Sequence, residues 1–208
     1  MGSGDVPRLS LEDVALPEPR ADVPLAEAED VHAEDILTAN DVPLTADGLQ
    51  LALDSGIELL QAAAARVAGA HGEVAVGDSL RALASGTGDT DRAAAAYALA
   101  RLGEPDGVAA LIACLDLPVE AYVAPVQAAG SLARLGDSRG LGVVERAMRS
   151  SNELVRAVAT KQLGFFGEEG RPLLEQALED PDSEIVRQAR HLLETQRPRL
   201  DSNQRPAD

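Results

Sequence analysis

Apolar and polar positions follow a pattern that recurs about every thirty residues between positions 98 and 167. The phrase Ala98-Leu99-Ala100-Arg101-Leu102-Gly103 is followed by related phrases at residues 131–136 and 162–167, and the closing glycines are 33 and 31 residues apart. A period of this length is typical of stacked helix pairs. The sequence therefore predicts an α-solenoid in which each glycine closes the first helix of a pair.

Alignment on these glycines predicts the remaining helices. Ser55-Gly56-Ile57-Glu58 has the spacing of a capping box, which starts a helix. The acids that directly follow the three glycines, Glu104, Asp137 and Glu168, suit the positive end of a second helix. The predicted first helices are 56–69, 90–102, 123–135, 152–166 and 183–196, and the predicted second helices are 75–85, 105–116, 138–150 and 169–179.

The second helices carry apolar stripes that an isolated helix pair cannot bury. Leu111, Val144 and Leu174 occupy equivalent positions once one loop residue is allowed for. Stacking of neighbouring pairs would join these stripes into one continuous core. We therefore expect a solenoid over residues 45–198. It divides into a degenerate unit at 45–88, units at 89–118, 119–150 and 151–181, and a terminal helix at 182–197.

Residues 1–44 lack a sustained helical period and contain five prolines and many acids. This composition predicts a disordered acidic arm, and residues 198–208 are expected to form a flexible tail. A short phrase, Asp-Val-Pro-Leu, occurs twice in the arm and has two interpretations: a recognition peptide, or biased composition in a disordered segment. Its residues are Asp22, Val23, Pro24, Leu25, Asp41, Val42, Pro43 and Leu44.

Composition supports an all-α fold and limits the classes of partner. Of the 208 residues 45% are hydrophobic but only two are Tyr and two are Phe, so the core must consist of Ala, Leu and Val, which favours helices that pack closely. The formal net charge is −17, and residues 1–47 carry −10 of it. Nucleic-acid binding needs clustered Lys and Arg, which argues against that class of partner.

Other sequence signals are weak or absent. No apolar run is long enough to span a membrane and the N-terminus has no secretory signal pattern, so we expect a cytoplasmic protein. Cys114 lies in an apolar segment and is expected to be a buried small hydrophobe rather than a nucleophile. His32, His71 and His191 belong to no ligand pattern, and we expect no metal and no cofactor.

Several segments resemble the short HEAT-like repeats of the phycobilisome-lyase (PBS lyase) type. The matching residues are Glu153-Leu154-Val155-Arg156, Leu135-Gly136-Asp137 and the stretch 178–187. The resemblance implies an α-solenoid, but it says little about function. HEAT-like deoxyhypusine hydroxylases bind iron through His-Glu pairs, which this sequence lacks, and HEAT-like DNA glycosylases imply a basic groove.

The sequence favours a non-enzymatic adaptor or scaffold that binds another protein or peptide, and its Arg and Ala bias suggests a bacterial source. A tetrapyrrole-chromophore lyase, or a subunit of one, is the alternative that the family resemblance implies. In HEAT-like stacks the second helices usually line the concave side, so polar residues on those helices are the candidate contacts, the alternative being solvated charges. These residues are Arg81, Glu145, Arg146, Arg149, Arg171, Glu175 and Gln176. Tyr97 is expected to be partly exposed on the convex side.

Overall fold

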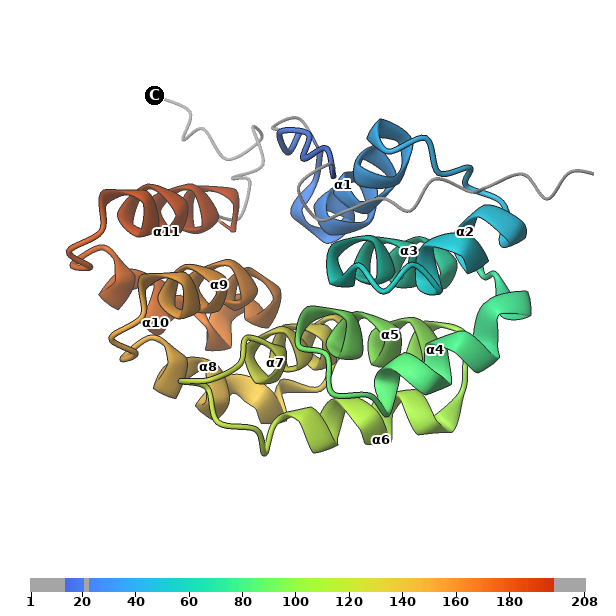
Figure 1. The fold of residues 1–208 in the computed structure, drawn as a ribbon. Helices are drawn as coiled ribbons and strands as arrows, with labels where there is room; N and C mark the ends of the chain where they lie inside the picture. The colour runs from blue at the N-terminus through green and yellow to red at the C-terminus, as the bar shows by residue number, and fades with distance from the viewer. Residues whose placement is uncertain (1–13, 21–22, 197–208) are drawn as a thin grey trace, which may run out of the picture.

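Two layers of antiparallel helices form a curved stack in the computed structural model, which describes residues 14–20 and 23–196 (Figure 1). The inner layer consists of α3 (Glu58–His71), α5 (Thr90–Arg101), α7 (Ala124–Arg134), α9 (Glu153–Leu163) and α11 (Ser183–Thr195). The outer layer consists of α4 (Gly77–Ala84), α6 (Pro105–Cys114), α8 (Leu141–Ala147) and α10 (Arg171–Ala177). The predicted all-α solenoid of HEAT-like helix pairs is confirmed.

Two further helices precede the stack. The first, α1 (Leu25–Ala39), packs on α3, and α2 (Ala46–Leu53) completes the first unit. Short 3-10 turns, η2 (Val74–Val76), η3 (Ser138–Gly140) and η4 (Gly164–Glu169), lie between inner and outer helices. No helix among the described residues has the length and apolar character needed to cross a membrane.

The closing glycines adopt a left-handed backbone that few other residues tolerate. Gly72, Gly103, Gly136 and Gly167 have φ values of 70°, 80°, 83° and 55°. At the first three, the following amide donates to the carbonyl five positions earlier, as Asp137 does to Leu132 at 2.9 Å. This hydrogen bond closes a helix in the Schellman manner. Gly72 shows that the degenerate first unit ends its inner helix in the same way as the clear repeats.

The acid that follows each glycine caps the next helix in only part of the stack. Asp137 accepts a hydrogen bond from the amide of Arg139 at 3.1 Å, as sequence analysis predicted. Glu104 makes no such bond at the start of α6 and instead forms an ion pair with Arg81 at 3.1 Å. Pro105 supplies the first residue of α6, where the missing amide hydrogen costs nothing.

A second set of acids connects the first three inner helices, α3, α5 and α7, to one another. Glu58, at the start of α3, accepts a hydrogen bond from the amide of Asp89 at 3.1 Å. The carboxylate of Asp89 in turn accepts from the amides of Val123 and Ala124, at 2.9 and 2.6 Å, where α7 begins. Carboxylates are favoured at helix N-termini, so these bonds hold the inner helices in register.

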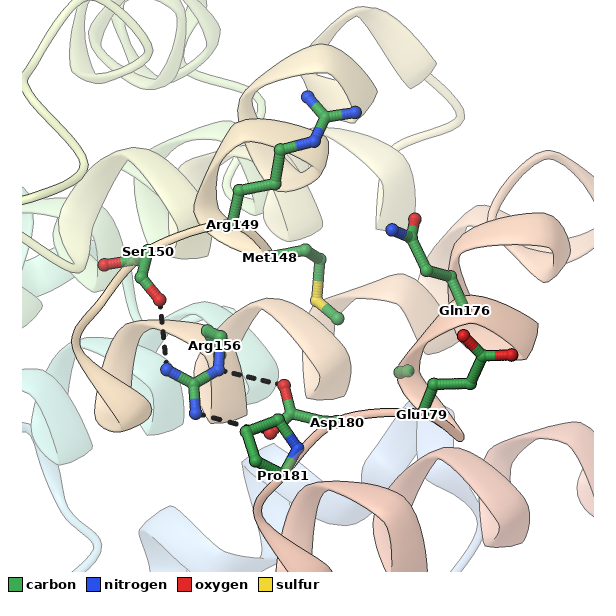
Figure 2. Close-up of a pocket in the computed structure, with 9 residues that line it drawn as sticks. Met148, Arg149, Ser150, Arg156, Gln176, Glu179, Asp180 and Pro181 are labelled. Atoms are coloured by element: carbon green, nitrogen blue, oxygen red, sulfur yellow. Dashed lines mark hydrogen bonds and ion pairs between the residues drawn. The ribbon is translucent and has the colours of Figure 1, made fainter.

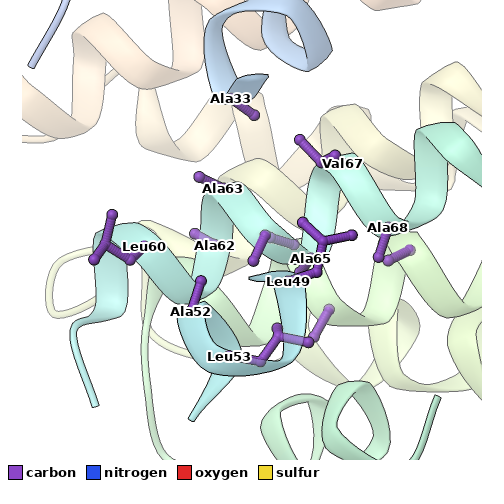
Figure 3. Close-up of a cluster of buried hydrophobic side chains, with 14 of the residues drawn as sticks. Ala33, Leu49, Ala52, Leu53, Leu60, Ala62, Ala63, Ala65, Val67 and Ala68 are labelled. Atoms are coloured by element: carbon purple, nitrogen blue, oxygen red, sulfur yellow. The ribbon is translucent and has the colours of Figure 1, made fainter. Parts of the chain in front are cut away.

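Small side chains allow the inner helices to approach closely. Four consecutive alanines of α5, residues 93–96, are almost fully buried. A Cβ added to Gly69 of α3 would lie 2.8 Å from the Cα of Ala98, so only glycine fits there. Figure 3 shows the first hydrophobic cluster, in which Leu49 and Leu53 of α2 and Leu60 of α3 fill the space between helices. The core is therefore built from Ala, Leu and Val, as the composition predicted.

The prediction of a disordered arm over residues 1–44 is wrong for residues 25–39, which form α1. Ala33, Ile36 and Leu37 of this helix are buried in the first cluster, and Figure 3 shows Ala33 facing α3. The helix escaped prediction because a buried acid, Glu29, occupies a position where a helical pattern expects an apolar residue. Residues 1–13 and the predicted tail at 198–208 lie outside the described residues.

Candidate functional site

The inner helices present cations and aromatic rings in two columns on the concave side. Counted back from the closing glycines, the first column lies six positions before and the second two positions before, one helical turn apart on the same face. The first column contains Arg66, Tyr97, Gly130 and Lys161, and the second contains Ala70, Arg101, Arg134 and Phe165. We call Arg66, Arg101, Arg134 and Lys161 the cation row, to which each of α3, α5, α7 and α9 contributes one residue.

Helix α1 lies against this row and inserts Glu29 into its centre. The side chain of Glu29 is only 7% exposed. One oxygen, Oε2, is 2.8 Å from Arg66 Nη1 and 3.0 Å from Arg134 Nη1. The other, Oε1, is 3.2 Å from Lys161 Nζ and accepts a hydrogen bond from Gln162 Nε2 at 3.2 Å. A single carboxylate therefore joins α1 to three inner helices.

Asp30 makes the neighbouring contacts. Its Oδ2 lies 2.6 Å from Arg101 Nη1 and 3.5 Å from Arg134 Nη2. Its other oxygen is buried and has no hydrogen-bond partner among the residues that the structure describes. Arg134 thus contacts both acids of α1 and is itself only 8% exposed. The adjacent acids Glu29 and Asp30 together form ion pairs with all four members of the cation row.

The electrostatics of Glu29 follow from these contacts. Burial alone would raise the pKa of its carboxyl, because a charge is poorly solvated in the protein interior. The cations Arg66, Lys161 and Arg134 outweigh burial, and together with the hydrogen bond from Gln162 they lower the pKa from 4.5 to about 2. Glu29 is therefore ionised across the physiological range and stabilises the contact as a charge.

Aromatic rings complete the surface beside the cation row. The guanidinium of Arg134 lies 4.8 Å from the ring centre of Tyr97 and 5.1 Å from that of Phe165. The guanidinium of Arg101 lies 5.7 Å from the ring centre of Tyr97. Such cation–π contacts stabilise a desolvated arginine. The expectation that Tyr97 is partly exposed on the convex side is wrong: it is 5% exposed on an inner helix.

An open cavity of about 720 Å³ lies between α1 and the inner helices. Leu25, Glu27 and Asp30 of α1 form one wall, and Tyr97, Arg101, Arg134 and Phe165 line the rest together with Ala133, Leu135 and Gly164. The cavity volume suits several side chains of a bound segment. The concave side thus offers charge, aromatic surface and space at one place.

Of the seven residues that the sequence suggested as concave contacts, six lie on the outer helices α4, α8 and α10, and Arg149 lies in the turn after α8 (Figure 1). That assignment to the concave side is therefore wrong, because the first helix of each pair, not the second, faces inward. Most of these residues pair locally: Arg81 with Asp78 at 2.8 Å, Arg149 with Glu145 at 2.6 Å, and Arg171 with Glu175 at 3.1 Å. Arg146 donates to the carbonyl of Gly142 at 3.2 Å.

Two of those residues, Arg149 and Gln176, line a smaller cavity of about 390 Å³ (Figure 2). Arg156 lies at its base, where its Nε is 2.9 Å from Asp180 Oδ2 and its Nη1 donates to the carbonyl of Ser150 at 3.0 Å. These contacts join the loop before α9 to the loop before α11. They satisfy Arg156 internally, so we assign this cavity a structural role.

The Asp-Val-Pro-Leu phrases belong to the folded chain wherever the structure describes them. In the first, Asp22 lies outside the described residues, Val23 and Pro24 precede α1, and Leu25 is its first residue. The second, Asp41 to Leu44, connects α1 to α2, and its Val42 and Leu44 pack against the first cluster. The second phrase is therefore a structural connection rather than a free recognition peptide.

Other chemistry is limited in the part of the chain that the structure describes. No cluster of three or more His, Cys, Asp or Glu side chains there is placed to hold a metal ion. Cys114 is 2% exposed, which confirms the prediction of a buried small hydrophobe, and burial raises the pKa of its thiol. A protonated, inaccessible thiol is a poor nucleophile.

Two family models agree with this architecture. The family model described as HEAT repeats matches residues 121–194, and that described as PBS lyase HEAT-like repeat matches residues 91–116. A crystal structure of an engineered protein from the Northeast Structural Genomics Consortium is similar at 20% identity, with a TM-score of 0.44 over 83% of this chain and 87% of that one. No curated protein matches the chain.

Proposed function

Because the chain is a HEAT-like repeat protein of the PBS lyase repeat type, we propose that it is a non-enzymatic scaffold that binds another protein through its concave side. One observation carries this proposal: helix α1 already lies on the concave side, held by charged side chains of several units. A surface that accommodates a helix of its own chain has the shape and polar groups to accommodate a helix of another protein.

The two sides of the stack differ in how much binding they can support. In the outer layer, the arginines Arg81, Arg149 and Arg171 form ion pairs with acids three or four positions away in the sequence, whose exposed carboxylates water already solvates. On the concave side, Arg101 and Arg134 are poorly exposed, stacked on rings and next to a cavity. Desolvated arginines beside aromatic rings are the groups that contribute most to protein interfaces.

A matched pair of variants tests this assignment. The full chain is expressed with an affinity tag in wild-type form, as Arg101→Ala on the concave side and as Arg149→Ala on the outer side. We expect one partner that the wild type and Arg149→Ala retain at a fixed stoichiometry and that Arg101→Ala loses. Loss with Arg149→Ala alone would contradict the concave assignment.

The non-enzymatic part of the proposal has its own test. Purified chain is mixed with a linear tetrapyrrole and its absorption spectrum is followed by titration. We expect no shift of the pigment bands, because a scaffold that binds only protein neither binds nor attaches the pigment. A saturable spectral shift would contradict the proposal and favour the lyase alternative.

A further inference from the structure

The two halves of α1 are held by different forces. In the C-terminal half, Ile36 and Leu37 are buried in the first cluster, and Asn40 donates to the carbonyl of Ile36 at 2.7 Å. In the N-terminal half, Glu29 and Asp30 contact the cation row. Leu25 adds a partly buried apolar contact near Gly164 and Leu192 of the C-terminal units. The N-terminal half is thus held mainly by charge, whereas the C-terminal half belongs to the core.

We propose that the cation row is a receptor for an acidic helix of a partner protein, and that the N-terminal half of α1 occupies this receptor until the partner replaces it. The inference rests on the proposed function and names the chemistry of the partner. The occupant has an apolar residue followed one helical turn later by two adjacent acids, as Leu25 is followed by Glu29 and Asp30.

Desolvation explains why the replacing segment must be acidic. With α1 in place the side chains of Arg66 and Arg134 are 12% and 8% exposed, so a helix that covers the row in the same way leaves little water to solvate either charge. An unpaired buried charge is strongly unfavourable. Neutral or basic segments would leave the row uncompensated, whereas a second pair of carboxylates restores every ion pair. The buried cations therefore make binding over the row favourable only for an acidic segment.

The net charge of the whole chain limits where an acidic helix can bind. With a formal net charge of −17, the protein repels acidic partners over most of its surface. Four of its 18 Lys and Arg residues gather in the cation row. Because the net charge of the protein does not attract an acidic helix, the attraction must come from the local positive charge of the cation row. Binding should accordingly be selective for the concave side.

The experiment uses a fluorescent peptide of residues 23–32, which contains the N-terminal half of α1, as the probe. Fluorescence anisotropy measures its binding to the full chain in wild-type form and as the double variant E29Q/D30N, whose own acids no longer occupy the row. The occupant in cis competes at millimolar effective concentration, so we expect the double variant to bind the probe at least about tenfold more tightly. We also expect this binding to weaken as the salt concentration rises.

Two controls and one substitute variant make the result decisive. A probe with the same two substitutions should bind at least about tenfold more weakly, because it lacks the carboxylates. The protein variant E34Q alters an acid of α1 that pairs with His71 and not with the row, and it should bind the probe as the wild type does. Should E29Q/D30N lose helical circular dichroism, Leu25→Ala replaces it, because that change loosens the same half without leaving cations unpaired.

Several outcomes would overturn the inference. Absence of saturable binding to a folded variant, or equal binding of the neutral probe, would show that the row is no acidic receptor. A dimer of E29Q/D30N in light scattering would make a second copy, not a partner protein, the occupant. Failure of the inference differs from failure of the proposed function, since Arg101→Ala could still lose a captured partner whose binding segment is not acidic.

Discussion

Replacement of Glu29 by glutamine is the most direct test of the contact between α1 and the stack. The change keeps the size of the side chain and removes its charge, so Arg66, Arg134 and Lys161 lose their shared partner. Lowering of the Glu29 pKa from 4.5 to about 2 corresponds to about 3 kcal/mol of stabilisation of the ionised form. Removal of one partner from a buried ion pair typically costs about 3–5 kcal/mol. Both estimates predict a loss of about 3 kcal/mol or more.

The assay is urea unfolding followed by helical circular dichroism, repeated between pH 7 and pH 2. A carboxyl whose pKa is lowered by folding stabilises the protein above its unfolded pKa, and this contribution disappears as the pH falls through the folded pKa. Wild-type protein should therefore lose stability between about pH 4.5 and pH 2. We expect Glu29→Gln to start lower by about 3 kcal/mol and to show less of this acid-dependent loss.

Glu34→Gln serves as the matched control, because it makes the same chemical change on the same helix. Glu34 is 35% exposed and contacts only the ring of His71 in the described structure, so a loss below about 1 kcal/mol is expected. Equal loss for both variants, or a pH profile of Glu29→Gln identical to that of the wild type, would refute the reasoning. Either result would mean that water stabilises the charges of these cations as well as the Glu29 carboxylate does.

The remaining predictions concern the turns, the packing and the cysteine. Gly136→Ala should lower the free energy of unfolding by about 1 kcal/mol in urea titrations, because φ is 83° there although space is open. Gly107→Ala should cost more, about 2–3 kcal/mol, because its Cβ would lie 2.2 Å from the amide nitrogen of Ala100; similar losses for the two would contradict the packing argument. Cys114 should react with a thiol reagent only after denaturant is added, and fast labelling of the native chain would contradict its burial.

The solenoid could be predicted from sequence because its signals are local. A glycine that needs a left-handed backbone and the leucines before it identify the end of each inner helix, as at Gly103 and Gly136. The direction of curvature could not be predicted in this way. Both helices of a pair carry apolar stripes, and the inner layer differs chiefly in its small residues, such as the buried alanines at 93–96, which let neighbouring units pack closely on that side.

The candidate site could be predicted only in part. A repeated arginine two positions before the closing glycine, at Arg101 and Arg134, is visible in the sequence and does mark the concave side. The helix that covers it is not visible, because hydrophobic periodicity treats Glu29 as a solvated residue. A buried acid becomes intelligible only when its partners are known, and Gln162, which donates to Glu29, lies 133 residues away in the sequence.

That long sequence separation changes how the stack should fold and unfold. In an ordinary solenoid each unit touches only its neighbours, so the terminal units can open independently. Here α1 belongs to the first hydrophobic cluster, while Glu29 and Leu25 reach α9 and the C-terminal cluster. The linear array is thereby closed into a loop of contacts, and the C-terminal units cannot open fully while α1 stays in place. We therefore expect this stack to unfold more cooperatively, and to fold more slowly, than a solenoid whose units touch only their neighbours.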